Sequence, residues 1–245
     1  MSNHEDLLAN FGEQTGAMLV AGREGFLPYR RFLKVLDVVE KHASAGGRRL
    51  MCVPAHDFTE DAERDDHINF MLGYACGTEA SAGGEPGRAT HAEITAALAA
   101  ARALDDAFWS SVDAAANSDE SDAPLADEPT VVRAVPYGPL AGVSIAFGVR
   151  QNAGMSVEEM EANDAGGGWE WNLATPPEGL KRVFGKDMDQ RRHPDHVLGL
   201  DLGYNGDWGT VALDVADARH AERARKLAAA GLDGEAVYWI LAVYD

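Results

Sequence analysis

Two short segments of the chain concentrate the residue types that bind divalent metals or transfer protons. The first runs from His56 to His67 and holds two histidines and six acidic residues within twelve positions. Imidazole nitrogens and carboxylate oxygens are ordinary ligands of zinc and related cations. His56, Asp57 and His67 are therefore candidate metal ligands. The alternative is structural, because acidic residues also gather in the first turn of a helix, where the helix dipole favours negative charge.

The His56-Asp57 dipeptide, which further His and Asp residues follow, resembles the motif of the helical metal-dependent phosphohydrolases. The resemblance covers the dipeptide alone. It implies a hydrolase that uses a divalent cation held by this segment.

The second segment runs from Arg191 to His196, directly before an expected strand, and contains His193, Asp195 and His196. This His-x-Asp-His pattern offers either two metal ligands or a general base with the carboxylate that orients it. The alternative is a polar turn whose shape is set by Pro194. The sequence therefore predicts either no cofactor or a divalent metal.

Three tryptophans are candidates for contact with a partner. Trp169 and Trp171 follow the glycine run 166–168, and Trp208 lies in the expected hairpin described below. Exposed tryptophans often anchor protein interfaces, but most tryptophans belong to the core.

The charge of the chain restricts its partners. It has 40 Asp and Glu against 21 Lys and Arg, a formal net charge of −19. Such a surface repels phosphate backbones and anionic lipid and attracts basic proteins. We therefore expect a basic protein partner, no direct contact with nucleic acid and no membrane association. Adaptation to high salt and simple solubility are alternative explanations of the acidity.

The sequence favours a cytoplasmic protein, or a component of a virion assembled in the cytoplasm. The first residues lack a secretory signal, and no apolar run approaches the roughly 20 residues that span a bilayer. Cys52 and Cys76 lie in apolar contexts without metal-ligand spacing, so we expect two buried, reduced thiols. Phosphate-loop, nucleophile-elbow and zinc-helix motifs are missing from the sequence.

The predicted fold class is α+β, with a helical N-terminal half followed by a mostly antiparallel sheet with flanking helices. We expect a mainly helical region over 1–116, an acidic linker over 117–129 and an α+β region over 130–245. In the first region, apolar spacing predicts a helix over 29–42, a short strand or buried connector over 49–53 and a helix from Thr59 that buries Ile68, Met71, Leu72 and Ala75. Thr90 and Glu93 form a capping box that opens an Ala-rich helix to about Ala116.

The C-terminal region is expected to contain strands over 131–135 and 143–149 and a short helix from Pro177 to Phe184. Asn205-Gly206 predicts a type I′ turn that joins the two strands of a hairpin over 197–215. Asp217 is expected to cap a helix that ends at Ala230, and 237–243 to form a buried strand. We find no internal repeat in the sequence.

These observations favour a non-enzymatic binding protein of the immunity, antitoxin or anti-defence type, whose acidic surface engages a basic partner. Two alternatives remain open. One is a metal-dependent hydrolase that uses a His/Asp cluster, and the other is a viral or cellular assembly protein that self-associates as a homo-oligomer.

Overall fold

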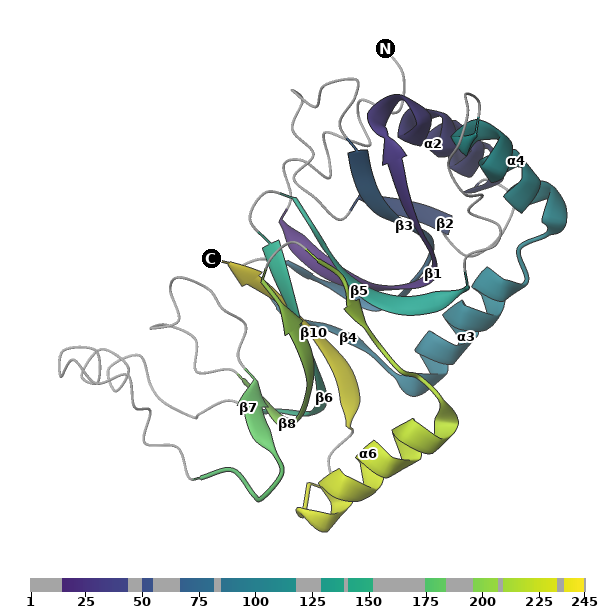
Figure 1. Ribbon diagram of the computed structural model, residues 1–245. Coiled ribbons are helices and arrows are strands. Elements are labelled where there is room, and N and C mark those ends of the chain that lie inside the picture. The colour runs from purple at the N-terminus through teal and green to yellow at the C-terminus, as the bar shows by residue number, and fades with distance from the viewer. Residues whose placement is uncertain are drawn as a thin grey trace.

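The structure is a computed structural model that describes residues 15–43, 50–54, 67–81, 85–117, 129–138, 141–151, 175–183, 196–206, 209–232 and 236–244. In these residues, ten strands form two antiparallel five-stranded sheets, and four helices flank them (Figure 1). Sheet A has the order β2-β3-β1-β5-β9 and contains β1 (Gly16–Pro28), β2 (Leu50–Pro54), β3 (His67–Ser81), β5 (Val131–Tyr137) and β9 (Val211–Ala212). Sheet B has the order β4-β10-β6-β8-β7 and contains β4 (Gly87–Ala89), β6 (Ala141–Gln151), β7 (Lys181–Val183), β8 (His196–Asn205) and β10 (Val237–Tyr244).

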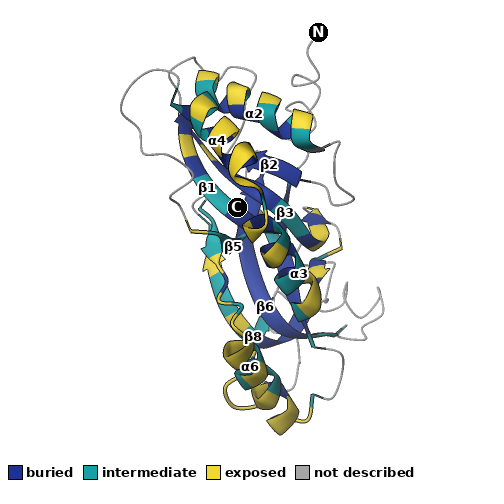
Figure 2. Cartoon of the chain, turned by 90° about the vertical axis from the view of Figure 1, so that its right-hand side faces the viewer, coloured by how far each residue is buried: buried dark blue, intermediate teal, exposed yellow. Residues whose placement is uncertain are grey.

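The largest apolar core joins the two sheets. It includes Leu19 of β1, Phe147 of β6 and Ile240 of β10, together with residues of α3 (His91–Arg102) and α6 (Asp217–Ala229). Figure 2 shows β6 as mostly buried, whereas α6 is mostly exposed. Burial of this shared apolar surface stabilises the two sheets as one body.

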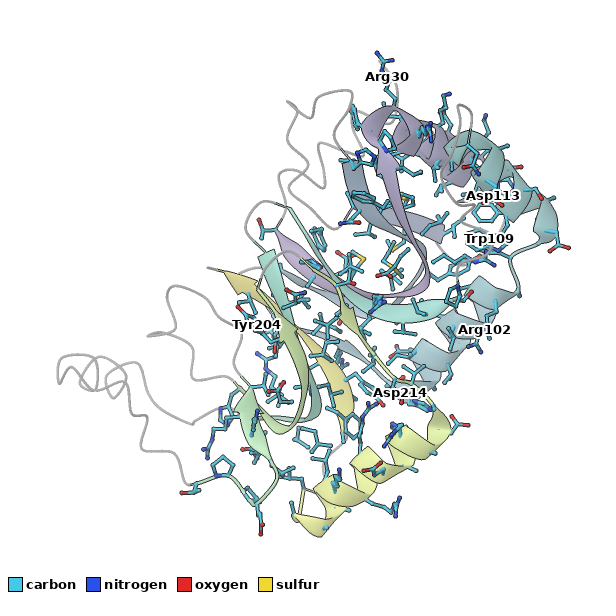
Figure 3. The ribbon with its side chains drawn as sticks, viewed as in Figure 1. Arg30, Arg102, Trp109, Asp113, Tyr204 and Asp214 are labelled. Carbon is cyan, nitrogen blue, oxygen red and sulfur yellow. The ribbon has the colours of Figure 1, made fainter. Side chains whose placement is uncertain are left out.

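A second core lies where α2 (Tyr29–Ala43) and α4 (Asp106–Ala116) cover the other end of sheet A. Phe32 of α2 and Phe108 of α4 pack there with Phe70 of β3. The Arg23 guanidinium lies 3.9 Å from the ring centre of Trp109, a cation–π contact that ties β1 to α4. Figure 3 labels Trp109 on the side of α4 that faces sheet A.

The two sheets repeat one topology, which corrects the expectation that the chain has no internal repeat. In sheet A, β1 lies between β3 and β5, and β2 pairs with the far side of β3. In sheet B, β6 lies between β8 and β10, and β7 pairs with the far side of β8. The series β1 to β5 (repeat 1) is thus followed along the chain by an equivalent series, β6 to β10 (repeat 2).

The register of the strand pairs repeats as well. Gly22 of β1 pairs with Gly73 and Val131, and Gly148 of β6 pairs with Gly199 and Val237. At both sites, a Cβ added to the central-strand glycine would overlap the backbone of the neighbouring strand. The two strands of each pair therefore approach so closely that only glycine fits.

A short sequence signature accompanies this register. Leu72-Gly73 is followed four residues later by Gly77, and Leu198-Gly199 is followed four residues later by Gly203. Gly77 has φ +76° and Gly203 has φ +145°, conformations that favour glycine. Each lies next to a register irregularity, at which the long strand bends.

The repeats exchange their fourth strands. β4 of repeat 1 pairs with β10 in sheet B, and β9 of repeat 2 pairs with β5 in sheet A. The two pairings are equivalent, because Arg88 of β4 faces Trp239 and Ala212 of β9 faces Arg133. Each sheet is therefore completed by a strand from the other repeat.

The prediction of a helical N-terminal half is wrong, because β1 and β3 are long strands. Ile68, Phe70 and Leu72 are buried on one face of β3, while Met71 is buried on the other. A strand that is buried on both faces has apolar residues at adjacent positions, which imitates helical spacing. The helix expected from Thr59 is thus a strand where the structure describes it.

Three further predictions are corrected. The helix expected from Thr90 to Ala116 is two helices, because the Asp105 side chain accepts a hydrogen bond from the backbone N–H of Phe108 and starts α4. The segment after Pro177 forms a turn and then β7. The expected 197–215 hairpin does not form, because β8 pairs with β6 and β7 in sheet B whereas β9 pairs with β5 in sheet A.

Several local predictions are confirmed. The helix over 29–42, the capping box of Thr90 and Glu93, the final helix from Asp217 and the strands over 49–53, 131–135, 143–149 and 237–243 all occur, with ends shifted by a few residues. Asp217 does not cap its helix, since the N-cap residue is Ala216.

The expected division of the chain at 117–129 stays a prediction, because residues 118–128 lie outside the described part. Sheet A contains strands from both sides of that segment. The boundary between the repeats falls between Tyr137 and Ala141.

We predict that Gly73→Ala and Gly199→Ala each lower the free energy of unfolding by about 1–3 kcal/mol, because the added Cβ overlaps the partner strand. Urea denaturation followed by tryptophan fluorescence measures this change. Ser110→Ala on the exposed face of α4 is the control and should stay within about 0.5 kcal/mol of the unsubstituted protein. If either glycine variant unfolds at the same urea concentration as the unsubstituted protein, the close approach of these strands is contradicted.

Candidate functional site

The best-defined polar site in the described residues lies where α3, α6 and β10 meet. We call it the junction cluster and define it as His91, Asp217, His220, Arg223 and Tyr238. Figure 3 labels Asp214 just before the start of α6, next to this site. The cluster joins the two repeats, because His91 belongs to repeat 1 and the other four residues belong to repeat 2.

The first residues of two helices contact each other in this cluster. His91 begins α3 and Asp217 begins α6, and each helix directly follows the exchanged strand of its repeat. Oδ1 of Asp217 lies 2.9 Å from Nε2 of His91. Because a carboxylate only accepts, Nε2 of His91 carries the proton in this pair.

The two histidine rings stack on each other. The ring centres of His91 and His220 are 4.0 Å apart, and the ring planes differ by 4°. The ring of Phe147 from β6 makes a T-shaped contact with the His220 ring, with 5.4 Å between ring centres. His220 therefore contacts both an imidazole and a phenyl ring.

Tyr238 connects His220 with Arg223. The Tyr238 hydroxyl lies 3.1 Å from Nδ1 of His220, and Nη1 of Arg223 donates a hydrogen bond to it at 3.2 Å. The same Arg223 atom donates to the Asp214 carbonyl at 2.7 Å. An arginine only donates, so the tyrosine oxygen accepts from Arg223 and can give its own proton to Nδ1 of His220. This arrangement satisfies all three groups when His220 is neutral.

The electrostatics favour that neutral form. Burial lowers the pKa of His220 below its ordinary value, His91 and Arg223 lower it further, and Asp217 opposes the shift. Burial also raises the pKa of Tyr238, against the influence of Arg223. Because Tyr238 is fully buried, its hydroxyl is a structural hydrogen-bond partner and not a group that a substrate reaches. The cluster is thus suited to respond to protons.

The candidate metal ligands are attached to different sheets. His67 begins β3 in sheet A, where it is exposed and stacks on Phe26 with 4.8 Å between ring centres. His196 begins β8 in sheet B and is buried. The other candidates, His56, Asp57, His193 and Asp195, lie outside the described residues. Within the described part of the chain, no group of three or more His, Cys, Asp or Glu residues is placed to hold a metal ion.

The repeat relates the two predicted clusters to each other. Residues 55–66 connect β2 to β3, and residues 184–195 connect β7 to β8, so both clusters belong to the same connection of the repeated topology. The two His/Asp clusters predicted from the sequence therefore fall in equivalent connections of the two repeats.

The remaining predicted residues are only partly placed. Trp169, Trp171 and Trp208 lie outside the described residues. Cys52 and Cys76 are free and buried, as expected. Burial raises the pKa of both thiols, that of Cys76 to about 12, so neither is a reactive nucleophile.

Comparison with protein-family models, curated proteins and solved structures finds no match to this chain. Across the described ranges, the helices are too short or too polar to cross a membrane. The function is therefore argued from the chain's own residues.

Sequence reasoning missed the junction cluster because its histidines are far apart in the chain. His91 and His220 have no local motif, and Asp217 was assigned to helix capping. The available signal was indirect: both His91 and Asp217 follow a short strand at the start of a helix, a similarity that is evident only once the repeat is recognised.

We predict that Tyr238→Phe lowers the free energy of unfolding by about 1–3 kcal/mol, because His220 and Arg223 lose the hydroxyl that they share. Urea denaturation at pH 7.5 measures the loss. Tyr204→Phe is the matched control, since Tyr204 is 49% exposed and the change should stay within about 0.5 kcal/mol. Equal effects of the two substitutions would show that the hydroxyl network contributes nothing.

Proposed function

We propose that the protein is a non-enzymatic binding protein that engages a basic protein partner through acidic segments carried on the two-sheet framework. The supporting observation is how the charge divides along the chain. The described residues contain 15 Lys and Arg and 14 Asp and Glu, a formal charge of +1. The other residues contain 6 basic and 26 acidic side chains, so they account for −20.

Three segments contain most of this negative charge. Residues 55–66, 118–128 and 152–174 each have a formal charge of −5. Salt adaptation and general solubility predict acidic residues spread over the whole surface. The described residues, which we call the framework, instead have a net charge close to zero. Negative charge that is concentrated in a few segments raises the association rate with a basic partner. It also favours basic partners over acidic ones.

The framework residues support a binding role in a second way. Many of the charged framework side chains pair with one another, as in Arg133 with Glu24 at 3.0 Å and Lys181 with Asp201 at 3.1 Å. Because the charges of these pairs cancel, most of the net negative charge of the chain comes from the acidic segments. An immunity, antitoxin or anti-defence protein that covers a basic surface of a nucleic-acid enzyme fits this distribution.

Neutralising one segment at a time tests the proposal. In one variant, the five acidic residues of 118–128 are replaced by their amides, namely Asp119, Glu120, Asp122, Asp127 and Glu128. In a second variant, the same change is made in 152–174, at Glu158, Glu159, Glu161, Asp164 and Glu170. The control neutralises the exposed framework residues Asp106 and Glu178 in the same way.

We predict that the immobilised protein captures a basic protein from an extract of its own cells. The Kd for that protein should rise at least tenfold between 50 and 500 mM salt, and it should rise when a segment is neutralised but not in the control. Isothermal titration with the purified partner measures these changes. Partners that are not basic, or a Kd that ignores both salt and neutralisation, would contradict the proposal.

The same preparation distinguishes the two alternatives. A stoichiometric divalent metal in the purified protein would favour the hydrolase, and symmetric self-association in light scattering would favour an assembly protein. Either result without a basic partner would replace the proposed function.

A further inference from the structure

The junction cluster is built so that one added proton breaks its hydrogen bonding. In the neutral state, Nδ1 of His220 accepts from the Tyr238 hydroxyl, while that oxygen accepts from Arg223. A proton on Nδ1 turns the acceptor into a donor. The tyrosine oxygen would then face two donors, and its own proton would have to find another acceptor in a fully buried site.

The charges around His220 oppose the same protonation. A charged His220 lies between Arg223 on its own helix and the face of His91 on α3, whose ring centre is 4.0 Å away. Asp217 is the nearest opposing charge, and its carboxylate is engaged by Nε2 of His91. The titratable and charged groups that face His220 are His91 of α3, Asp217 and Arg223 of α6 and Tyr238 of β10, and the Asp214 carboxylate before α6 acts on Tyr238.

Within the described residues, little else holds helix α6 to the protein. Leu227 is its only buried residue, and most of its other side chains are exposed (Figure 2). The salt bridges of Arg219 and Lys226 run to Glu222 on the same helix and to Asp214 just before it. Apart from Leu227 and partly buried alanines, the junction cluster is the main contact of α6 with the sheets and α3.

We propose that protonation of His220 releases α6 from the two-sheet body, so that the junction cluster acts as a pH-sensitive latch between the two repeats. Release breaks the stack on His91 and separates α6 from α3. It uncovers the apolar surface around Phe147 and Leu227, both of which belong to the core between the sheets. This inference goes beyond the proposed partner binding and does not depend on it.

The direction of the pH effect follows from linkage. His220 has a pKa in the folded protein that is lower than its ordinary value of 6.5, so the unfolded chain binds the proton more readily. The stability that neutral His220 provides is therefore complete above about pH 6.5. It is lost progressively as the pH falls from there through the lowered folded-state pKa.

Hydrogen exchange of the full chain tests the latch. At pH 5.5, backbone amides of 217–229 should exchange several-fold faster than at pH 7.5, after correction for the intrinsic pH dependence of exchange; titration of one histidine with an ordinary pKa of 6.5 limits the increase to about tenfold. Amides of β1 and β6 should keep their protection. Unchanged exchange of α6 between the two pH values would overturn the proposal.

Two variants separate the latch from general acid sensitivity. His220→Phe keeps a ring that can contact His91 and Phe147 but cannot be protonated, so its α6 exchange should not change with pH. His42→Phe, at the end of α2 and packed on Phe108, should keep the pH response of the unsubstituted protein. The same acid response in His220→Phe would overturn the proposal.

If His220→Phe does not fold, a measurement on the unsubstituted protein replaces it. The Cε1–H resonance of His220 in NMR spectra should titrate with the same midpoint as the loss of α6 protection. Opening of α6 at a pH where this resonance has not begun to titrate would contradict the latch.

Discussion

The backbone hydrogen bonds of two exchanged strands are the contacts on which the rest of the fold depends. β4 leaves repeat 1 to pair with β10, and β9 leaves repeat 2 to pair with β5. Both strands are short, three and two residues, and each is the edge strand of the sheet that it joins. Neither sheet is complete without the other repeat, and the apolar core between the sheets contains residues of both. We therefore expect each repeat to depend on the other for its folding.

The repeat also explains where the polar contacts lie. Glu24 of β1 and Arg150 of β6 occupy equivalent positions, and each reaches the segment just before the exchanged strand of the other repeat. Glu24 contacts Thr210 before β9 at 3.0 Å, and Arg150 pairs with Glu85 before β4. Glu24 is acidic and Arg150 is basic, but each links its central strand to the segment before the exchanged strand of the other repeat. At the junction cluster, the equivalent first residues of α3 and α6 meet directly, and His220 makes that contact sensitive to protons.

Elements that depend on neighbouring residues in the chain could be predicted from the sequence. Elements that depend on hydrogen-bond pairing between distant strands could not. The Thr90–Glu93 capping box and the strand over 237–243 follow from neighbouring residues and are confirmed. β3 was mistaken for a helix because both of its faces are buried, and the 197–215 hairpin failed because β9 pairs with β5 of the other repeat. The junction cluster depends on contacts over more than 120 positions, which no local pattern contains. The acidic segments and the two His/Asp clusters lie outside the described residues, except for His67 and His196, which begin strands of different sheets.

Cutting the chain between the repeats tests the central claim, that the two halves interlock through exchanged strands. A protease site inserted between Pro139 and Leu140 allows the folded protein to be cleaved at the repeat boundary, and size-exclusion chromatography then measures the products. We predict that the two fragments elute together with the circular dichroism of the uncut protein and separate only in denaturant. Elution as two independently folded fragments in native buffer would contradict the exchange.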